Sequence, residues 1–262
     1  TDVLEMLIKN GKAVPGRSLV VAASHGHPNT VSTLLDLKCI PNSQHPDRTA
    51  LIAAAAGGHP NTVHILLERR ADPNLFDRRG HTALHEAAMV GDPDIAAALL
   101  TAKADPDASS RFQLARTPLH EAAGRGNVKI VMLLLRANAD VNKVVHGSGH
   151  GSGRTALMYA SICGAFAVVR VLIKHNANVK MQSDDGKTAY DSAIEHNHTA
   201  IAAVLVEAMT CSPKKTIQKT IQNPTHQRTK ENQQEQEKVR MCKTLNIFAF
   251  DECFNACFNA YI

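Results

Sequence analysis

The sequence RTPLHEAAGRGNVKIVMLLLRANADVN at residues 116–142 contains two short helical patterns separated by a glycine. The first pattern is rich in alanine and follows Thr117. It stops at Gly126, as expected where a helix ends in a left-handed residue. The second pattern runs from Val128 to Arg136, and the Ala-Asp-Val-Asn after it has the composition of a turn. This stretch predicts a helix–turn–helix unit followed by a loop.

The same unit recurs along the chain. Its copies begin at Arg48, His81, Arg116, Arg154 and Lys187, each directly followed by threonine, and a degenerate copy begins at Arg17 with Ser18 in the threonine position. From Ser18 through the successive threonines the spacings are 31, 33, 35, 38 and 33 residues, which gives a base period near 33. One such unit cannot bury its apolar helix face alone, whereas stacked units form a continuous core. The recurrence therefore predicts a solenoid.

The ends of the array differ from its middle. Residues 3–13 predict the second helix of a partial unit, and the period is lengthened by insertions at Asp107–Arg116 and Asn142–Arg154. The last unit carries Asp191 where the others have His or Met, and its second helix is predicted to end at Val206. Because the last repeat of a solenoid has one face in water, we interpret this unit as a carboxyl-terminal cap.

We accordingly divide the chain into a partial repeat at 1–16, a six-unit array at 17–210 and a tail at 211–262. The tail is rich in Gln, Lys, Thr and Asn and is expected to be mostly disordered, since it buries little apolar surface. Its apolar end, 245–262, is either a short docking helix or an artefact of gene modelling. The chain begins with Thr1, so we expect it to be a fragment or a processed product.

Two copies carry the signature that identifies the family. Thr117–His120 is an intact Thr-Pro-Leu-His, and Thr82–His85 departs from it at one residue. Over roughly residues 3–208 the chain resembles the ankyrin repeat family. The resemblance implies an all-α ankyrin solenoid of helix–turn–helix units joined by hairpin-like loops. It also implies that His85 and His120 brace the turn before each helix with the signature threonine, and that they are not catalytic.

The resemblance further implies that a partner protein binds the concave face, at loop tips and at exposed positions of the first helices. The candidates on the loops are Arg78, Arg79, His81, Arg111, Phe112, Arg116, Arg154 and Lys187, and those on the helices are Met89, Val90, Arg125 and Ile162. Most loop candidates are basic, although residues 1–210 hold 21 Lys and Arg against 19 Asp and Glu. We therefore expect an acidic partner segment with an apolar anchor. Ordinary solvated charges are the alternative.

Composition excludes several other classes. The formal net charge of +5 is too small to predict a nucleic-acid-binding surface. No stretch approaches the length of a membrane span. Six cysteines, at positions 39, 163, 211, 242, 253 and 257, form no disulfide framework, so a reduced compartment, cytoplasmic or nuclear, is favoured. We expect a monomer without cofactor or metal.

Each of four further motifs has a functional interpretation and an alternative without a specific function. The glycine-rich insertion 144–153, with His146 and His150, lacks the Gly-Lys-Ser/Thr ending of a phosphate loop and is interpreted as a flexible loop. Cys253 and Cys257 are too few for a structural zinc site, and palmitoylation is an alternative. Residues 214–243 are interpreted as a solvated linker in preference to a nucleic-acid or lipid contact. Asn142 resembles substrates of asparaginyl hydroxylation, although a turn role is favoured.

An enzyme is the competing functional class, because ankyrin arrays are often joined to kinases, methyltransferases or acyltransferases. The chain contains no Gly-x-Ser-x-Gly motif, no nucleotide-binding glycine loop and no zinc ligand set. Glu86 and Glu121 recur because the repeats recur, whereas a general acid and base must converge in one pocket. We therefore predict a protein-binding scaffold. The alternative is the regulatory region of a larger enzyme.

Overall fold

The computed structural model describes residues 15–210, apart from residues 46, 111–114, 146 and 148–150. Residues 1–14 of the predicted partial repeat and the predicted tail lie outside the described residues, whereas Pro15 and Gly16 begin α2. The chain divides into two compact units, Thr1–Ser212 and Pro213–Ile262, so every described residue belongs to the first unit.

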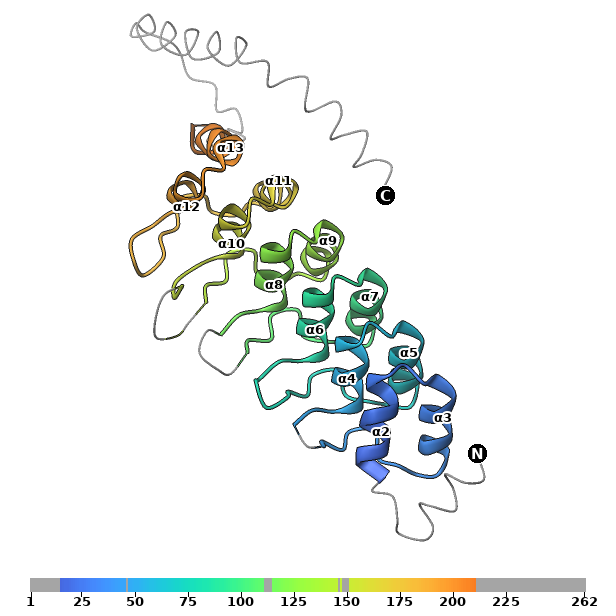
Figure 1. Ribbon diagram of the computed structural model, residues 1–262. Helices are drawn as coiled ribbons and strands as arrows, with labels where there is room; N and C mark the ends of the chain where they lie inside the picture. The colour runs from blue at the N-terminus through green and yellow to red at the C-terminus, as the bar shows by residue number, and fades with distance from the viewer. Residues whose placement is uncertain (1–14, 46, 111–114, 146, 148–150, 211–262) are drawn as a thin grey trace, which may run out of the picture. The chain divides into compact units, whose positions relative to one another are not determined.

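The described residues form six helix pairs, which we number as repeats 1 to 6. The pairs are α2 (Pro15–Ser24) with α3 (Pro28–Asp36), α4 (Ala50–Ala56) with α5 (Pro60–Glu68), α6 (Ala83–Val90) with α7 (Pro93–Thr101), α8 (Pro118–Arg125) with α9 (Val128–Arg136), α10 (Ala156–Ile162) with α11 (Phe166–Lys174), and α12 (Ala189–Glu195) with α13 (Thr199–Thr210). Each first helix packs on the first helix of the next repeat, and each second helix does the same. The two helix layers lie side by side, and the long loops project beyond the layer of first helices (Figure 1). None of the described helices is long and apolar enough to cross a membrane.

Small residues allow the first helices to pack closely. One alanine position recurs in every repeat and is buried each time, at Ala22, Ala54, Ala87, Ala122, Ala160 and Ala193. In the second helices a leucine recurs in the same way, at Leu34, Leu66, Leu99, Leu134, Leu172 and Leu205, and each is fully buried. The core is therefore continuous along the stack, as predicted for units that cannot bury their faces alone.

Threonine and glycine caps set the helix boundaries in the middle of the array. The Oγ1 atom of Thr49 accepts the backbone N–H of Ile52 at 3.3 Å and caps α4. Gly91 and Gly126 end α6 and α8 in the left-handed conformation, with φ of 88° and 73°. Gly164 also has positive φ, but it follows the capping residue Cys163. The glycine prediction is confirmed at two positions and displaced by one residue at the third.

Two boundaries differ from the sequence-based prediction. Helix α2 begins at Pro15, so Ser18 lies within the helix and does not occupy the position of the threonine that precedes the other first helices. Gly26 and Gly58 occupy equivalent turns 32 residues apart, which places Arg17 in the threonine position, and proline tolerates the first helical turn without a side-chain cap. Helix α13 continues past Val206 to Thr210, because Glu207, Ala208 and Met209 are good helix formers.

A ladder of side-chain to backbone hydrogen bonds joins successive loops. The side-chain oxygens of Asn42, Asn74, Asp107 and Asn142 accept the backbone N–H of Asp72, Asp105, Asp140 and Asn178, at 2.8, 2.8, 3.0 and 2.7 Å. Each acceptor thus holds the loop of the following repeat. The turn role favoured for Asn142 has a structural basis in this ladder, and its hydroxylation remains a prediction.

The last repeat is partly polar at its outer end. The carboxylate of Asp191 accepts the backbone N–H and the hydroxyl of Thr188 at 2.8 and 2.7 Å, so aspartate replaces histidine in bracing the turn. Ile194 is 47% exposed, whereas the equivalent Ala88 and Ala123 are fully buried against the next repeat. The cap interpretation of this unit remains a prediction.

Candidate protein-binding face

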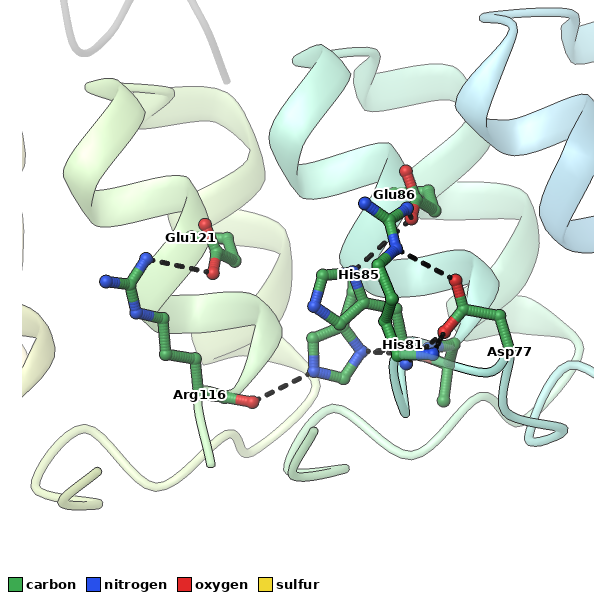
Figure 2. Close-up of polar contacts among 8 residues, drawn as sticks. Asp77, His81, His85, Glu86, Arg116 and Glu121 are labelled. Atoms are coloured by element: carbon green, nitrogen blue, oxygen red, sulfur yellow. Dashed lines mark hydrogen bonds and ion pairs between the residues drawn. The ribbon is translucent and has the colours of Figure 1, made fainter. Parts of the chain in front are cut away.

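Histidines of the signature hold the loops in place. In repeat 3 the backbone N–H of Thr82 donates to Nδ1 of His85 at 3.2 Å, and the Thr82 hydroxyl lies 2.9 Å from the same atom. Because Nδ1 accepts, Nε2 carries the proton, and it donates to the carbonyl oxygen of Arg116 at 3.0 Å. Figure 2 shows this bond crossing from repeat 3 to repeat 4. The histidine braces its own turn and fixes the following loop.

Burial keeps both signature histidines neutral. It lowers the pKa of His85 and of His120 to about 4. At neutral pH the two imidazole rings are therefore uncharged and form hydrogen bonds as neutral groups. The structural role that the family resemblance implied for them matches this geometry.

Repeat 4 departs from this pattern at one atom. The Nδ1 of His120 accepts from the backbone N–H of Thr117 at 3.2 Å, but its Nε2 has no hydrogen-bond partner of good geometry. The His120 ring stands edge-on to Tyr159 with centroids 5.7 Å apart. The insertion at 142–154 lies between the two repeats, and backbone groups of Arg154 and Lys143 still interact with the His120 ring.

A cluster of charges surrounds the loop tip of repeat 3. Arg79 contacts the carboxylates of Glu86 at 2.9 Å and Asp77 at 3.4 Å. The Nδ1 of His81 lies 3.4 Å from the same Glu86 oxygen, and its ring stacks on His85. Glu86 is nearly buried, while the Arg79 side chain is 60% exposed. The cluster (Figure 2) therefore presents a fixed guanidinium above a buried carboxylate.

The other basic loop candidates described by the structure are paired as well. Arg116 contacts Glu121 at 3.4 Å and places its guanidinium 4.7 Å from the centre of the Tyr159 ring. The remaining pairs are Arg78 with Asp47 at 3.5 Å, Arg154 with Asp185 at 3.9 Å and Lys187 with Glu195 at 2.6 Å. The loop edge thus carries both signs of charge. Arg78 is the most open of these cations, with 80% of its side chain exposed.

Asp77, His81 and Glu86 are also the group of metal-ligating type found within the described residues. Their ligand atoms lie within 4.8 Å of one another. However, the Arg79 guanidinium already contacts both carboxylates, and Oδ1 of Asp77 accepts the backbone N–H groups of Arg79 and His81 at 2.8 Å each. A metal ion would have to displace Arg79. The arrangement is therefore best described as an ion-pair cluster.

The helix candidates lie at the ends of the first helices. Val90 is 48% exposed at the end of α6, Arg125 is exposed on α8, and Met89 and Ile162 are half-buried. We call the surface that the loop and helix candidates are predicted to form the loop-side face. Arg111 and Phe112 lie outside the described residues, so the predicted aromatic contact keeps the status of a prediction.

The predicted residues omitted the acidic half of this face. Glu86 and Glu121 were dismissed as repeat copies, yet they are the partners of Arg79 and Arg116. A signal for these contacts was present in the spacing, because Glu86 lies five positions after His81 and Glu121 lies five positions after Arg116.

These helix pairs, braces and loop ladders define a helical-repeat solenoid whose repeats each add one loop to a common face. The sequence profile of ankyrin repeats (three copies) matches residues 19–110, 77–145 and 119–217. The chain belongs to the ankyrin repeat family. Among solved structures, it is similar to the ankyrin repeat domain of Bcl-3, described as a unique member of the IkappaB protein family. The identity is 28% and the TM-score 0.64, over 73% of this chain and 85% of that domain. Ankyrin repeats are non-catalytic protein–protein interaction modules.

Proposed function

We propose that this chain is a scaffold that binds a partner protein on its loop-side face, and that the partner presents acidic residues beside an apolar anchor. The exposed guanidiniums of Arg78 and Arg79 carry the proposal. Their intrachain carboxylates fix their orientation while leaving N–H donors in water, and a guanidinium has enough donors to serve two carboxylates. Val90, which is 48% exposed at the end of α6, supplies apolar surface.

Charge reversal tests the proposal. Replacing Arg78, Arg79 and Arg116 together by Glu should remove a partner that the wild-type chain captures from cell extract. The matched control reverses Lys38, Arg70 and Arg136, which lie at the ends of second helices and change the net charge equally. Circular dichroism verifies that both triple variants fold. Equal capture by the wild type and the loop-side variant in low salt would overturn the acidic-partner proposal.

We further propose that the protein is a monomer in a reduced compartment, the cytoplasm or the nucleus. Cys39 and Cys163, the cysteines within the described residues, are free thiols, and burial raises the pKa of the Cys39 thiol. Size-exclusion chromatography with light scattering tests the monomer. A concentration-independent dimer mass would contradict it.

A further inference from the structure

Helix α8 contains a glycine that neither its backbone nor its packing requires. Gly124 lies within the helix and, unlike Gly126 two residues later, does not have a positive φ. A Cβ atom on Gly124 would meet Sγ of Cys163 and Cβ of Tyr159, both at 4.0 Å, which is ordinary van der Waals contact. Glycine inside a helix is destabilising relative to alanine, because it loses more conformational freedom on folding. Nothing that the structure describes around Gly124 therefore explains the absence of a side chain.

The other repeats carry a side chain at this position, which lies seven residues after the signature threonine or after Arg17. The equivalent residues are Ser24, Ala56, Met89, Ile162 and Glu195. The neighbours in the stack, Met89 and Ile162, are half-buried apolar residues, and α8 packs on both of their helices, α6 and α10. Because equivalent positions of stacked repeats form a row, Gly124 leaves a gap between two apolar side chains. We call this place, bordered by Tyr159 and Cys163, the α8 gap.

Cations lie at the edge of the α8 gap. The ring of Tyr159, whose Cβ borders the gap, has the guanidinium of Arg116 at 4.7 Å from its centroid. Arg116 also contacts Glu121 at 3.4 Å, so its orientation is fixed while 35% of its side chain is exposed. Arg125, at the end of α8, is exposed. Residues 122–183 contain eight Lys and Arg and a single acidic residue, so this part of the array has a strong positive balance.

We propose that the α8 gap receives the apolar anchor of the acidic partner segment. The anchor side chain lies over Gly124 against Tyr159 and Cys163, and an acidic residue beside it pairs with Arg116. The positive balance of the surrounding repeats complements an acidic segment. A phosphate group could pair with Arg116 but would place no apolar group in the gap, so a protein segment fits better than nucleic acid. The inference rests on the proposed function and adds the position of the anchor.

Gly124→Ala tests whether the fold needs the glycine. The added methyl group meets its neighbours at van der Waals distance, so alanine should improve the helix without a clash. Thermal unfolding followed by circular dichroism should therefore show a midpoint about 2–4 °C above that of the wild type. A lower midpoint would show that the glycine serves the fold itself, and would overturn the inference.

Peptide binding to the full chain tests the occupant. The probes are fluorescein-labelled peptides of alternating Glu and Leu, of Glu and Ala, and of Lys and Leu, compared by fluorescence polarisation. The wild type should bind the Glu–Leu peptide, bind the Glu–Ala peptide about tenfold more weakly because it has no anchor, and not bind the Lys–Leu peptide. Gly124→Leu fills the gap, so it should weaken the Glu–Leu peptide about tenfold and abolish the preference for leucine over alanine.

Ala56→Leu is the matched control, because it adds the same side chain at the equivalent position of repeat 2. It should keep both the affinity and the preference of the wild type. A general disturbance of the fold would weaken both acidic peptides and keep the preference, so its loss in Gly124→Leu alone is specific to the gap.

The thiol of Cys163 gives a second measurement on the unmodified chain. Cys163 is exposed and borders the gap, so saturating Glu–Leu peptide should slow its alkylation by iodoacetamide several-fold. Peptide mass spectrometry reads this rate separately from those of the other cysteines. If Gly124→Leu does not fold in thermal unfolding, the protection of Cys163 decides alone.

Four outcomes would overturn the inference. They are failure of the wild type to bind the Glu–Leu peptide, an unchanged leucine preference in Gly124→Leu, equal alkylation of Cys163 with and without the peptide, and binding of a labelled single-stranded oligonucleotide in place of the Glu–Leu peptide. The charge-reversal test on the captured partner decides the wider proposal separately. A partner that the loop-side variant loses and Gly124→Leu keeps would leave the scaffold function in place and refute the gap alone.

Discussion

The carboxylate of Asp107 accepts the backbone N–H of Asp140 through both of its oxygens, at 3.0 and 3.1 Å. In the preceding repeat the equivalent residue is Asn74. Its side-chain oxygen accepts the backbone N–H of Asp105 in the following loop, and its Nδ2 donates to the carbonyl oxygen of Lys103 at 3.1 Å. An ionised Asp107 has no proton to donate to the equivalent carbonyl of Asn138. Burial raises its pKa above the usual 3.8. The ladder of hydrogen bonds between successive loops is therefore weaker between repeats 3 and 4, because its acceptor there is a partly buried carboxylate that cannot donate.

Asp107→Asn should stabilise the array at pH 7 by about 1 kcal/mol, because the amide restores one hydrogen bond and removes a partly buried charge. A raised folded-state pKa means that the wild type loses stability as the pH rises from 3.8 through that pKa. The gain in the variant should therefore be full at neutral pH and shrink toward pH 4. Urea unfolding followed by circular dichroism at the two pH values measures it.

Asp105→Asn is the control for this ladder variant. Its carboxylate accepts the backbone N–H of Asp107 within its own turn at 2.9 Å, so an amide there brings no new inter-repeat bond. A gain in Asp107→Asn that is equal at pH 4 and pH 7 would contradict the charge explanation.

The buried histidines predict a separate loss of stability in mild acid. Their pKa of about 4 in the folded state lies below the ordinary 6.5, so the unfolded chain binds more protons between these values. Stability is therefore complete above pH 6.5 and falls as the pH drops toward 4. Each ring contributes a loss of about 3 kcal/mol across this window. His85→Ala should lower stability at pH 7 and flatten the pH dependence below 6.5.

His64, which is exposed on α5, provides the matched control for the buried ring. His64→Ala should leave both the stability at pH 7 and its slope against pH unchanged. If His85→Ala kept the full slope of the wild type, the acid sensitivity would have to come from other groups.

The middle of this fold was predictable because local chemistry and the repeat period agree there. The helix from Val128 to Arg136 was predicted with its observed bounds, since its apolar spacing, its preceding glycine and its following turn all give the same answer. The first unit is predicted one residue out of register because Ser18 resembles the recurring threonine, whereas Gly26, the turn glycine that shows the true register, lies eight residues later.

The binding face was less predictable from sequence. Basic residues at loop positions are visible in the sequence, but their pairing depends on how closely a loop approaches the next helix. Arg79 reaches both Asp77 and Glu86 only because the turn folds back over α6.

A residue in a strained left-handed backbone conformation follows several of the second helices. Substitution of Arg70 tests how much this conformation destabilises the fold. Arg70 has a φ of 61°, and Lys38, Lys103, Asn138 and Asn176 share this left-handed conformation at equivalent places. Glycine adopts it without the steric penalty of a Cβ atom. Arg70 is exposed and makes no ion pair recorded among the described residues, so Arg70→Gly should raise the free energy of unfolding by about 0.5–1 kcal/mol.

Glu68, two residues earlier and still within α5, is the matched control for the glycine substitution. Glu68→Gly should destabilise by about 1 kcal/mol, because glycine within a helix loses more conformational entropy. Destabilisation by both variants in thermal unfolding would show that the left-handed position carries no strain.

An unsatisfied hydroxyl in the core provides the last test. Thr62 on α5 is 1% exposed, and its Oγ1 has no hydrogen-bond partner in the described structure. Repeats 3 to 6 place Ile95, Ile130, Val168 and Ile201 at this position, all buried, so the site is apolar in most of the array. Thr62→Val replaces the hydroxyl by a methyl group and should stabilise by about 1 kcal/mol, since a buried unpaired hydroxyl carries its full desolvation cost.

Thr33→Val on α3 is the control, because its hydroxyl donates to the carbonyl oxygen of Asn29 at 3.0 Å and is partly exposed. Chemical unfolding should rank Thr62→Val above the wild type and Thr33→Val at or below it, and the reverse order would mean that the Thr62 hydroxyl is satisfied in solution.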